Sequence, residues 1–541
     1  RNGDICIVYP RKDPNETVLN NQILKGNVAH IDAEIVEVNF RHKQKNMSFF
    51  KSNPLWAIEH DRLDTSYNNM YKSLFEFLKA PKQKRNLLLG LQAPMSENIQ
   101  FKDVYPENLI QKAIAAKDYF LIVGPPGTGK TSIFARRLIE EYYAKEDVNI
   151  LVLAYTNRAV DELCDAVNVA FGHTDEQCDK FIRIGSNLSC SDKYRHRLLQ
   201  NISQKAEDRK SIRLEIEQTR IFVSTLASIA SRMDLFQLKH FQIAIIDEAS
   251  QILEPQIIGL LPKFDKFILI GDHNQLSTIV LQKQICSKIT EPELINIGIT
   301  DCKDSFFERL LRSCIEQNWT QSYSSLTVQG RMHTDISAFP SKYFYSGQLF
   351  PANEWQHDSW NLKSDSLNDI FHQTVAKERI AFFSTENTTA NSFSDKTNEF
   401  EAETIVNLIN AIRDIYKINN KELNANILGI IAPYRNQIAM IRHKLIQADI
   451  PNAENIMIDT VERFQGSQRD IILLSFCINK PYQLDFLSNL SHDGKVDRKL
   501  NVALTRARQQ LYLVGNIRLI SKHPIYNSLL QFLKDRTYIL N

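Results

Sequence analysis

The N-terminal part of the chain alternates apolar and polar residues with a period of two. In residues 33–41 one face of an extended segment is apolar, with Val36, Val38 and Phe40. The other face is polar, with Glu37, Asn39 and Arg41. Similar short runs, separated by polar turns, occur throughout residues 3–58. This alternation is typical of strands with one buried face, and it predicts a small β-barrel or antiparallel sheet in residues 1–60.

The period then changes to that of an amphipathic helix. Apolar side chains recur every three or four residues, at Tyr67, Tyr71, Leu74, Phe75 and Leu78. Candidate N-caps are Asp64, Thr65 and Ser66, and Pro81 ends the pattern. Because such a stripe is usually a packing surface, we predict a helical stalk in residues 61–100 with this stripe packed against its neighbours.

From about residue 119 the chain alternates apolar runs with helical stretches. The runs are short and continuous, at 119–123, 150–154, 221–224, 243–246, 267–270, 427–432, 471–476 and 511–514. Strands that are buried on both faces of a parallel sheet have this composition, and their alternation with helices is typical of doubly wound α/β domains. We therefore predict an α/β fold with two such domains, at residues 101–322 and 323–541.

Composition excludes several classes of protein. The 541 residues are 43% hydrophobic and 24% charged, close to globular averages. The chain has 65 Lys and Arg residues and 63 Asp and Glu residues. This balance excludes a polybasic protein that coats nucleic acid, so any nucleic-acid contact must come from a local groove. No apolar run approaches the roughly 20 residues needed to span a bilayer, so we expect a soluble protein with no membrane partner.

The cysteines and the first residue of the sequence bear on where the protein is located and on whether a further N-terminal part is expected. The eight cysteines are scattered without a C-x-x-C pair, so we expect reduced intracellular thiols in place of disulfides or structural zinc. The chain begins with Arg1, and we expect a further N-terminal part. Asn-, Ile- and Lys-rich usage favours a bacterial cytoplasmic protein, and a eukaryotic one would be nuclear.

A phosphate-binding motif follows the first apolar run of the α/β region. Residues 124–131 fit G-x-x-x-x-G-K-[ST], with Gly124, Pro125, Gly127, Thr128, Gly129, Lys130 and Thr131 as candidate nucleotide contacts. The glycines let backbone N–H groups cradle phosphate oxygens at the start of a helix. Lys130 is expected to reach the β- and γ-phosphates, and the Thr131 hydroxyl to bind Mg²⁺.

An acidic pair supplies the second half of such a site. Asp247 and Glu248 follow the apolar run 243–246. We expect Asp247 to hold Mg²⁺ through water and Glu248 to orient and deprotonate the attacking water. Because phosphate and carboxylate oxygens would hold the metal, the predicted cofactors are ATP and Mg²⁺.

Five further segments make the resemblance specific. They are D-E-A-S at 247–250, L-I-G-D-H-N-Q-L at 269–276, L-T-V-Q-G-R-M-H at 326–333, D-T-V-E-R-F-Q-G at 459–466 and L-N-V-A-L-T-R-A-R at 500–508. In order and spacing they resemble the motifs of superfamily 1 helicases, in the 5′→3′ branch that includes the nonsense-mediated-decay helicase and the replication nuclease-helicase. The resemblance covers about residues 60–520. It implies two RecA-like motor domains, preceded by a small β-barrel on a helical stalk, and an ATP-dependent helicase.

The resemblance also implies roles for single residues. Arg331 and Arg506 would be arginine fingers that stabilise charge on the γ-phosphate, Gln275 would sense that phosphate, and Gly466 would contact the nucleotide. The backbone phosphates of a nucleic acid would be bound, without reading its sequence, by Thr156, Asn157, Thr225 and Thr460. For each of these threonines, local helix capping is the alternative interpretation.

The expected nucleic-acid partner is single-stranded DNA, with RNA as the alternative. Residues 56–61 and the helix after them look most like the nuclease-helicase group, which favours DNA and also a nuclease domain before Arg1. The alternatives are an RNA helicase or ribonucleoprotein remodeller, an ATP-gated clamp that does not unwind, and a P-loop ATPase unrelated to nucleic acid.

Three positions depart from the family pattern. Gly330 stands where the family has the tyrosine that stacks on adenine, and Pro106 or Glu107 where it has a glutamine that reads the adenine edge. We therefore predict a relaxed nucleobase preference, with GTP hydrolysed within about tenfold of ATP, unless Tyr434 restores the stacking. Gln468 replaces the usual Glu, so it is not assigned to the site.

Overall fold

The computed structural model describes residues 4–540, except residues 12, 14–15, 19, 33, 41, 62–64, 98–103, 173–179, 279, 281, 283, 366 and 386–393. The chain divides into two compact units. The first unit comprises Arg1–Gln92, Ala135–Asp247 and Glu254–Phe267, and the second comprises Ala93–Phe134, Glu248–Leu253 and Ile268–Asn541. The predicted domain limits at 60, 100 and 322 stay predictions.

The first unit opens with a small antiparallel sheet. Its strands are β1 (Ile5–Pro10), β2 (Leu24–Ile31), β3 (Val36–Phe40) and β4 (Trp56–His60), in the order β3-β2-β1-β4. The buried side chains of Cys6, Val8, Leu24 and Val28 pack with rings that include Phe49 and Phe50 of α1 (Met47–Lys51). This confirms the antiparallel sheet. In that order β3 and β4 are edge strands, so the described strands form an open sheet.

The helix predicted after this sheet is α2 (Thr65–Lys79), and its apolar stripe is exposed. The exposed fractions are 63% for Tyr67, 73% for Tyr71, 40% for Leu74, 58% for Phe75 and 63% for Leu78. The prediction that this stripe packs against its neighbours is therefore wrong for the chain as described. The candidate N-cap Asp64 lies outside the described residues.

A glycine contact decides which face of α2 is buried. The Gly259 N–H donates to Ser73 Oγ at 3.0 Å, and a Cβ on Gly259 would lie 2.0 Å from the Ser73 carbonyl oxygen. Only a glycine permits so close a backbone approach. Lys263 pairs with Glu76 on the same side at 2.9 Å, and Phe77 is buried there. The packed face is thus set by a distant glycine that the periodicity of α2 does not reveal.

Four parallel strands of the first unit lie side by side. They are β9 (Ile243–Ile246), β6 (Ile150–Ala154), β8 (Ile221–Thr225) and β7 (Phe181–Ile184), hydrogen-bonded in that order. Every residue in them is buried. The helices of at least seven residues in this unit also include α3 (Lys82–Leu88), α5 (Arg136–Tyr143), α6 (Asn157–Ala170), α7 (Leu199–Lys205) and α8 (Arg209–Gln218).

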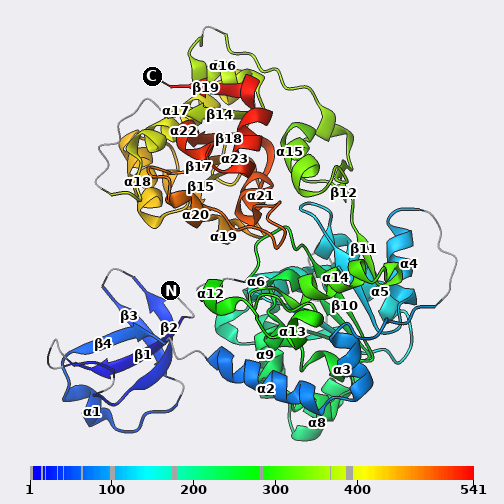
Figure 1. The fold of residues 1–541 in the computed structure, drawn as a ribbon. Coiled ribbons are helices and arrows are strands. Elements are labelled where there is room, and N and C mark those ends of the chain that lie inside the picture. The colour runs from blue at the N-terminus through cyan, green and yellow to red at the C-terminus, as the bar shows by residue number, and fades with distance from the viewer. Residues whose placement is uncertain are drawn as a thin grey trace. The chain divides into compact units, whose positions relative to one another are not determined.

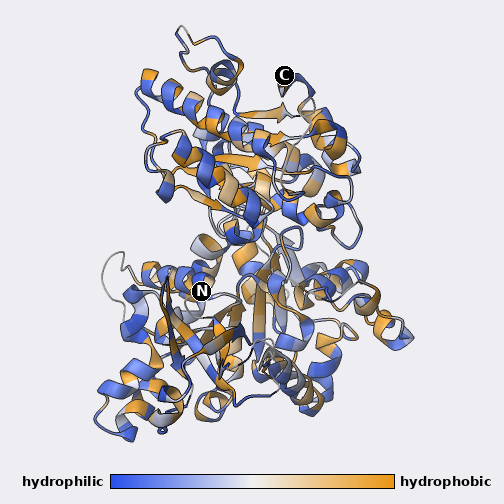
Figure 2. Ribbon diagram, turned by 90° about the vertical axis from the view of Figure 1, so that its left-hand side faces the viewer, coloured by the Kyte–Doolittle hydropathy of each residue, from blue (hydrophilic) through white to orange (hydrophobic). Residues whose placement is uncertain are grey.

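The second unit contains a six-stranded parallel sheet. Its strands are β16 (Met457–Asp459), β15 (Leu428–Ile431), β17 (Arg469–Ser475), β18 (Ala507–Gly515), β14 (Ile380–Ser384) and β19 (Thr537–Ile539), in that order. Alternate residues of the sheet enter two different hydrophobic clusters, such as Ile472 in one and Leu473 in the other. Near the C-terminus in Figure 2 these strands are largely orange, whereas the helices around them mix blue and orange.

Helices surround this sheet (Figure 1), and those of at least seven residues are α15 (Thr334–Phe344), α16 (Ile370–Lys377), α17 (Glu399–Ile418), α18 (Arg435–Gln447), α21 (Arg498–Leu504) and α23 (Pro524–Phe532). The second unit also contains α4 (Glu107–Ala115) and α14 (Phe306–Glu316), which lie away from this sheet. The same unit pairs β5 (Tyr119–Val123) in parallel with β11 (Tyr323–Ser325). The predicted α/β class with parallel sheets is confirmed. Among the described helices, none is long and apolar enough to cross a membrane.

Candidate nucleotide site and nucleic-acid contacts

The predicted phosphate-binding loop directly follows β5. The Gly124 N–H donates to the carbonyl of Gly271, the last residue of β10 (Lys266–Gly271), at 2.8 Å. Gly127 and Gly129 have φ of +75° and +76°, where any other residue would be strained. The helical segment Lys130–Ala135 begins immediately afterwards. The loop therefore has the tight backbone, followed by a helix start, that favours phosphate binding.

Lys130 folds over this loop. Its Nζ donates to the Gly124 carbonyl oxygen at 2.6 Å, and a Cβ on Gly124 would lie 2.3 Å from Lys130 Cγ. Gly124 thus leaves room for the lysine side chain that crosses it. The buried Thr128 donates its hydroxyl to the Pro125 carbonyl at 2.8 Å, which stabilises the loop itself. Thr131 is partly buried and follows Lys130 directly.

The two predicted carboxylates follow β9. Asp247 is buried, and its N–H donates to the Leu153 carbonyl at 2.8 Å, which continues the pairing of β9 with β6. Glu248 has a left-handed backbone with φ of +52°, and its Oε2 accepts from Gln251 Nε2 at 3.1 Å. This conformation costs a non-glycine residue about 1–2 kcal/mol. Eight other described non-glycine residues also have a positive φ, and the role predicted for Glu248 stays a prediction.

Arg506 is a buried cation bonded to neutral groups. It is 2% exposed, and its Nη2 donates to Gln275 Oε1 at 2.9 Å. Its other bonds go to the carbonyls of Val502 at 3.0 Å and Ser467 at 3.3 Å. Burial, reinforced by the charge of Arg331, lowers the pKa of Arg506 to about 9, so it stays cationic at neutral pH. The charges of Glu248 and Asp272 act in the opposite direction, but neither carboxylate is among the hydrogen-bond partners given above. An anionic ligand bonded to this arginine would further offset the cost of burying its charge.

Arg331, the second predicted finger, lies beside the phosphate-binding loop. The Gly330 N–H donates to the Gly127 carbonyl at 2.9 Å, and a Cβ on Gly127 would lie 2.5 Å from Arg331 Cβ. Arg331 Nε donates to Gln468 Oε1 at 2.8 Å. The replacement of the family Glu therefore puts a neutral amide, which does not cancel the arginine charge, against this finger.

Further residues hold the segment that carries Gln275. Asp272 and Asn501 lie inside the quoted motifs but had no assigned role, and Tyr345 lies outside every motif. Tyr345 donates its buried hydroxyl to Asp272 Oδ2 at 2.7 Å, and Asn501 Nδ2 donates to that hydroxyl at 2.8 Å and to the Asn274 carbonyl at 2.7 Å. Asp272 also accepts from Gln275 Nε2 at 2.7 Å. Gln275 and Tyr345 are therefore linked through one carboxylate, that of Asp272.

A buried ion pair completes this arrangement. Arg498 Nε donates to the His273 carbonyl at 2.8 Å, and Arg498 Nη2 lies 2.7 Å from Glu308 Oε2. Both side chains are more than nine-tenths buried. The signal in the sequence was weak: Arg498 sits in a locally basic stretch, and Glu308 is one of many helical glutamates.

Tyr105 is another residue that the motifs missed, and it lies near the two departures that concern the nucleobase, Gly330 and Pro106. It precedes Pro106 in the chain, and N–H groups of Thr327 and Val328 near its hydroxyl partly offset the rise in its pKa caused by burial. Its ring centroid is 6.2 Å from that of Phe134, in the helical segment after the phosphate-binding loop. With 37% of its surface exposed, this ring is a candidate for the base contact that Gly330 lacks.

Tyr434, the substitute predicted from the sequence, lies elsewhere in the second unit. It lines a cavity whose walls come from the six-stranded sheet and its helices. The atoms nearest to a Cβ built on Gly330 belong to Asn353, at 3.2 Å, and Ala352, at 3.9 Å. Stacking by Tyr434 at the Gly330 position stays a prediction without support from these contacts.

Two of the predicted nucleic-acid contacts form helix caps. Thr156 Oγ1 accepts from the Ala159 N–H at 3.2 Å, and Thr225 Oγ1 accepts from the Ser228 N–H at 3.1 Å. Asn157 is exposed as the first residue of α6. Thr156 and Thr225 nevertheless lie close together, because Ala154 pairs with Thr225 across the adjacent ends of β6 and β8. The capping interpretation is confirmed for both threonines, and their phosphate contacts stay predictions.

Thr460 differs from these two threonines. It precedes α19 (Val461–Phe464) as the N-cap residue, but its side chain makes no capping hydrogen bond. It is partly exposed. Gly466, which follows α19, has φ of +78° and leads into the loop before β17. The hydroxyl of Thr460 therefore has no part in holding its own helix.

The residues present fit a nucleoside triphosphate with Mg²⁺. The glycine cradle of the phosphate-binding loop and the buried Arg506 suit an anion with several charged oxygens. The hydroxyl of Thr131 and the carboxylate of Asp247 are oxygen donors of the kind that Mg²⁺ prefers. The fold and this site define the class as a P-loop nucleoside triphosphatase, with Arg331 beside its phosphate-binding loop.

Comparison with known proteins narrows the class of protein that the fold and the site define. Two family models described as AAA domains match the chain, one over residues 302–518 and the other over residues 105–205 and 188–283. Together with the relatives described next, they confirm the resemblance to superfamily 1 helicases that the ordered motifs indicated.

Two of the similar proteins are named helicase/nucleases, and a third is named a regulator of nonsense transcripts. The DNA replication ATP-dependent helicase/nuclease JHS1 of Arabidopsis thaliana is 28% identical over 91% of this chain and 35% of its own length. The corresponding DNA2 of Bos taurus is 27% identical over 96% of this chain and 48% of its own length. Regulator of nonsense transcripts 1 of Dictyostelium discoideum is 28% identical over 78% of this chain and 31% of its own length. The chain spans half or less of the length of these curated relatives.

Proposed function

We propose that this chain is the motor of an ATP-dependent helicase that moves 5′→3′ along single-stranded DNA. The observation that carries the proposal is the convergence of Arg331 and Arg506 with the phosphate-binding loop and Gln275, within one compact unit. A buried cation with neutral partners is suited to bind an anion that comes and goes. The choice of DNA rests on relatives named DNA replication helicase/nucleases, which match more than nine-tenths of the chain.

The residues divide the work of hydrolysis among them. The backbone of Gly124–Gly129, Lys130 and Thr131 would hold the phosphates and, with Asp247, the Mg²⁺, which when bound neutralises charge on the phosphate oxygens. Glu248 would accept a proton from the attacking water. Arg331 and Arg506 would stabilise the charge that develops on the γ-phosphate. Because Arg506 also holds Gln275, its contacts would change with nucleotide and alter the grip on the strand.

Several parts of the proposal go beyond the motor itself. A nuclease or other domain before Arg1 is proposed because the chain matches only part of proteins named helicase/nucleases. A cytoplasmic or, in a eukaryote, nuclear location follows from a DNA substrate. Relaxed nucleobase preference follows from Gly330 and Pro106. More than hundredfold preference for ATP over GTP would contradict it.

The first test is steady-state ATPase activity without nucleic acid, with single-stranded DNA and with single-stranded RNA, at matched length and stated salt. DNA is expected to stimulate turnover most. Equal or greater stimulation by RNA would favour an RNA helicase or remodeller, and no stimulation would contradict the motor.

Lys130→Ala is expected to remove more than nine-tenths of the activity. Strand displacement on duplexes with a 5′ or a 3′ tail then separates a helicase from a clamp and tests polarity.

A further inference from the structure

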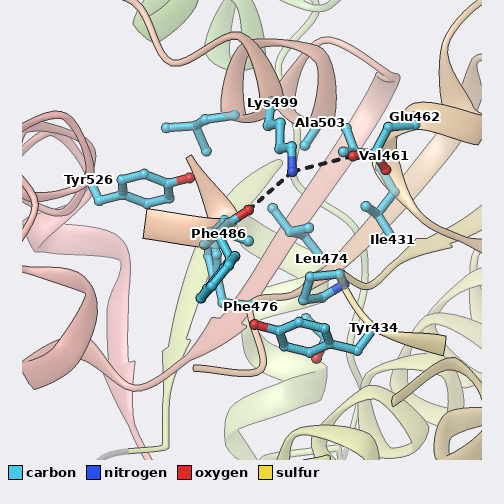
Figure 3. A pocket seen from close by; sticks show the side chains of 14 residues that line it. Ile431, Tyr434, Val461, Glu462, Leu474, Phe476, Phe486, Lys499, Ala503 and Tyr526 are labelled. Carbon is cyan, nitrogen blue, oxygen red and sulfur yellow. Dashed lines mark hydrogen bonds and ion pairs between the residues drawn. The ribbon is translucent and has the colours of Figure 1, made fainter. Parts of the chain in front are cut away.

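A cavity of about 70 Å³ opens at the carboxyl ends of β15 and β17. Aromatic rings line it from four parts of the second unit, at Tyr434, Phe476, Phe486 and Tyr526 (Figure 3). Phe476 and Tyr526 are buried and close its inner side, with ring centroids 5.9 Å apart. The cavity is therefore a formed, largely apolar space. None of the residues predicted to bind the phosphates or Mg²⁺ lines it, and Tyr434 is the one lining residue to which a base contact was assigned from the sequence.

One wall of the cavity is exposed. Phe486, on α20 (Gln483–Leu487), leaves 67% of its surface in contact with solvent. Tyr434 is partly buried, and Gln483 Nε2 donates to its hydroxyl at 3.4 Å. An exposed ring beside a ring-lined space offers stacking to a planar ligand. The free energy of such a stack on a nucleobase does not depend on the base sequence.

The mouth of the cavity carries groups that suit a phosphate backbone. Lys499 Nζ lies between the Phe486 carbonyl, at 3.1 Å, and Glu462 Oε1, at 3.4 Å (Figure 3). Thr460, whose hydroxyl makes no capping bond, is followed directly by the lining residues Val461 and Glu462. Glu462 disfavours a free anion, but a nucleotide held within a strand would place its base against the rings and its phosphate near Lys499, with Thr460 next to the lining residue Val461. These chemistries together favour a single-stranded nucleic acid over an apolar protein side chain.

The walls of the cavity also hold the arginine of the nucleotide site. One face of α21 gives Lys499, Leu500 and Ala503 to the cavity. Its other face gives Arg498 to the His273 carbonyl and Asn501 to the Asn274 carbonyl, next to Gln275. On the other side of the cavity, α19 leads to Ser467, whose carbonyl accepts from Arg506. A ligand that shifts α19 or α21 therefore shifts the groups that hold Arg506.

We propose that this cavity is a pocket for one nucleobase of the bound strand, and that its occupation is transmitted through α19 and α21 to Arg506. The proposal rests on the proposed function, because it gives the second unit's contact with the strand a place and a consequence. It explains how a bound strand would stimulate hydrolysis at the separate nucleotide site without its base sequence being read.

The test compares Phe486→Ala with wild type and with Ile446→Ala, a truncation of another exposed apolar residue, 65% exposed on α18. Binding of a fluorescent oligo-dT is measured by anisotropy, alongside oligonucleotides of the same length with one abasic position moved along the strand. For wild type and Ile446→Ala, one abasic position is expected to weaken binding about fivefold or more. Phe486→Ala is expected to bind intact oligo-dT that much more weakly and to ignore the abasic position.

ATPase measurements separate this proposal from the proposed function. Phe486→Ala is expected to keep its turnover without nucleic acid while the DNA concentration for half-maximal stimulation rises in step with the loss of binding. If wild type binds and is stimulated, but abasic strands behave like intact ones and Phe486→Ala behaves like Ile446→Ala, the pocket is refuted and the motor stands. If wild type neither binds nor is stimulated by DNA or RNA, the proposed function fails first.

Discussion

The candidate nucleotide site and the strand-end threonines of the first unit are built in different ways. Around Arg506 the protein buries a cation, gives it neutral partners and ties it to Gln275. At Thr156 and Thr225 the side chains instead cap the helices that follow their strands. A site for a highly charged ligand thus carries a visible electrostatic imbalance. A site that grips a backbone without reading sequence can be built from ordinary helix starts and leaves no such mark.

The largest expected effect tests that imbalance directly. Arg506→Ala removes the buried cation, and turnover is expected to fall about 10³-fold or more, the usual contribution of an arginine finger. Steady-state ATPase activity with saturating single-stranded DNA measures it. Arg508→Ala is the matched control, because Arg508 is partly exposed and paired with Asp470 at 3.1 Å, so little change is expected. Equal losses in both variants would contradict the assignment of Arg506.

Glu248→Gln separates chemistry from binding in the same site. Without a proton acceptor, hydrolysis is expected to fall about 10²- to 10⁴-fold, while a fluorescent ATP analogue still binds within a few-fold of wild type. Single-turnover hydrolysis and equilibrium titration supply the two readouts. Loss of nucleotide binding would show that Glu248 has a different role.

A buried titratable group that lies outside the nucleotide site extends the comparison between the two regions. Glu401 of α17 is fully buried, with Ser475 Oγ donating to its Oε2 at 2.6 Å and the Cys477 N–H at 2.9 Å. Burial raises the pKa of Glu401 to about 7 from 4.5. Between these pH values the folded state keeps a proton that the unfolded state has lost, so its contribution to stability, up to about 3 kcal/mol, is lost as pH rises from about 4.5 through 7.

Glu401→Gln is therefore expected to remove this pH dependence without affecting the nucleotide site. The variant should melt close to wild type at pH 5 and at a higher temperature than wild type at pH 8, as measured by thermal unfolding. Turnover at pH 7 is expected to be unchanged. A variant whose advantage does not grow with pH would show that Glu401 ionises normally in the folded chain.

The smallest expected effect concerns the base contact. Tyr105→Ala is expected to raise the KM for both ATP and GTP about fivefold, because a stacked base is worth roughly 1–3 kcal/mol. Tyr105→Phe, which keeps the ring, should leave both KM values close to wild type. The measurement is ATPase and GTPase activity over a range of nucleotide concentrations. If Tyr105→Ala changes neither KM, the base lies away from this ring.

Prediction from the sequence worked where chemistry and periodicity are local. The continuous apolar run at 150–154 predicted β6 with its bounds, and the G-x-x-x-x-G-K-T spacing located a loop whose Gly127 and Gly129 do take left-handed conformations. It failed for α2, where the stripe with the stronger pattern is exposed and the face beside Gly259 is buried. Tyr105, Tyr345 and Glu308 carried no motif, because their positions depend on partners far away in the chain.

The sequence by itself determined the parallel α/β class, the order of the motifs and the residue types that a triphosphate requires. These follow from short-range rules, since strand burial and the phosphate-loop conformation are set within a few residues. Only the tertiary structure decided that Arg506 rests on Gln275, that Arg331 meets a neutral Gln468, and that α21 shows one face to the nucleotide residues and the other to an aromatic cavity. Arg331 and Gln468 are 137 residues apart in the chain, and Arg506 and Gln275 are 231 residues apart. The packing of whole helices and strands creates these contacts, and no local sequence pattern encodes that packing.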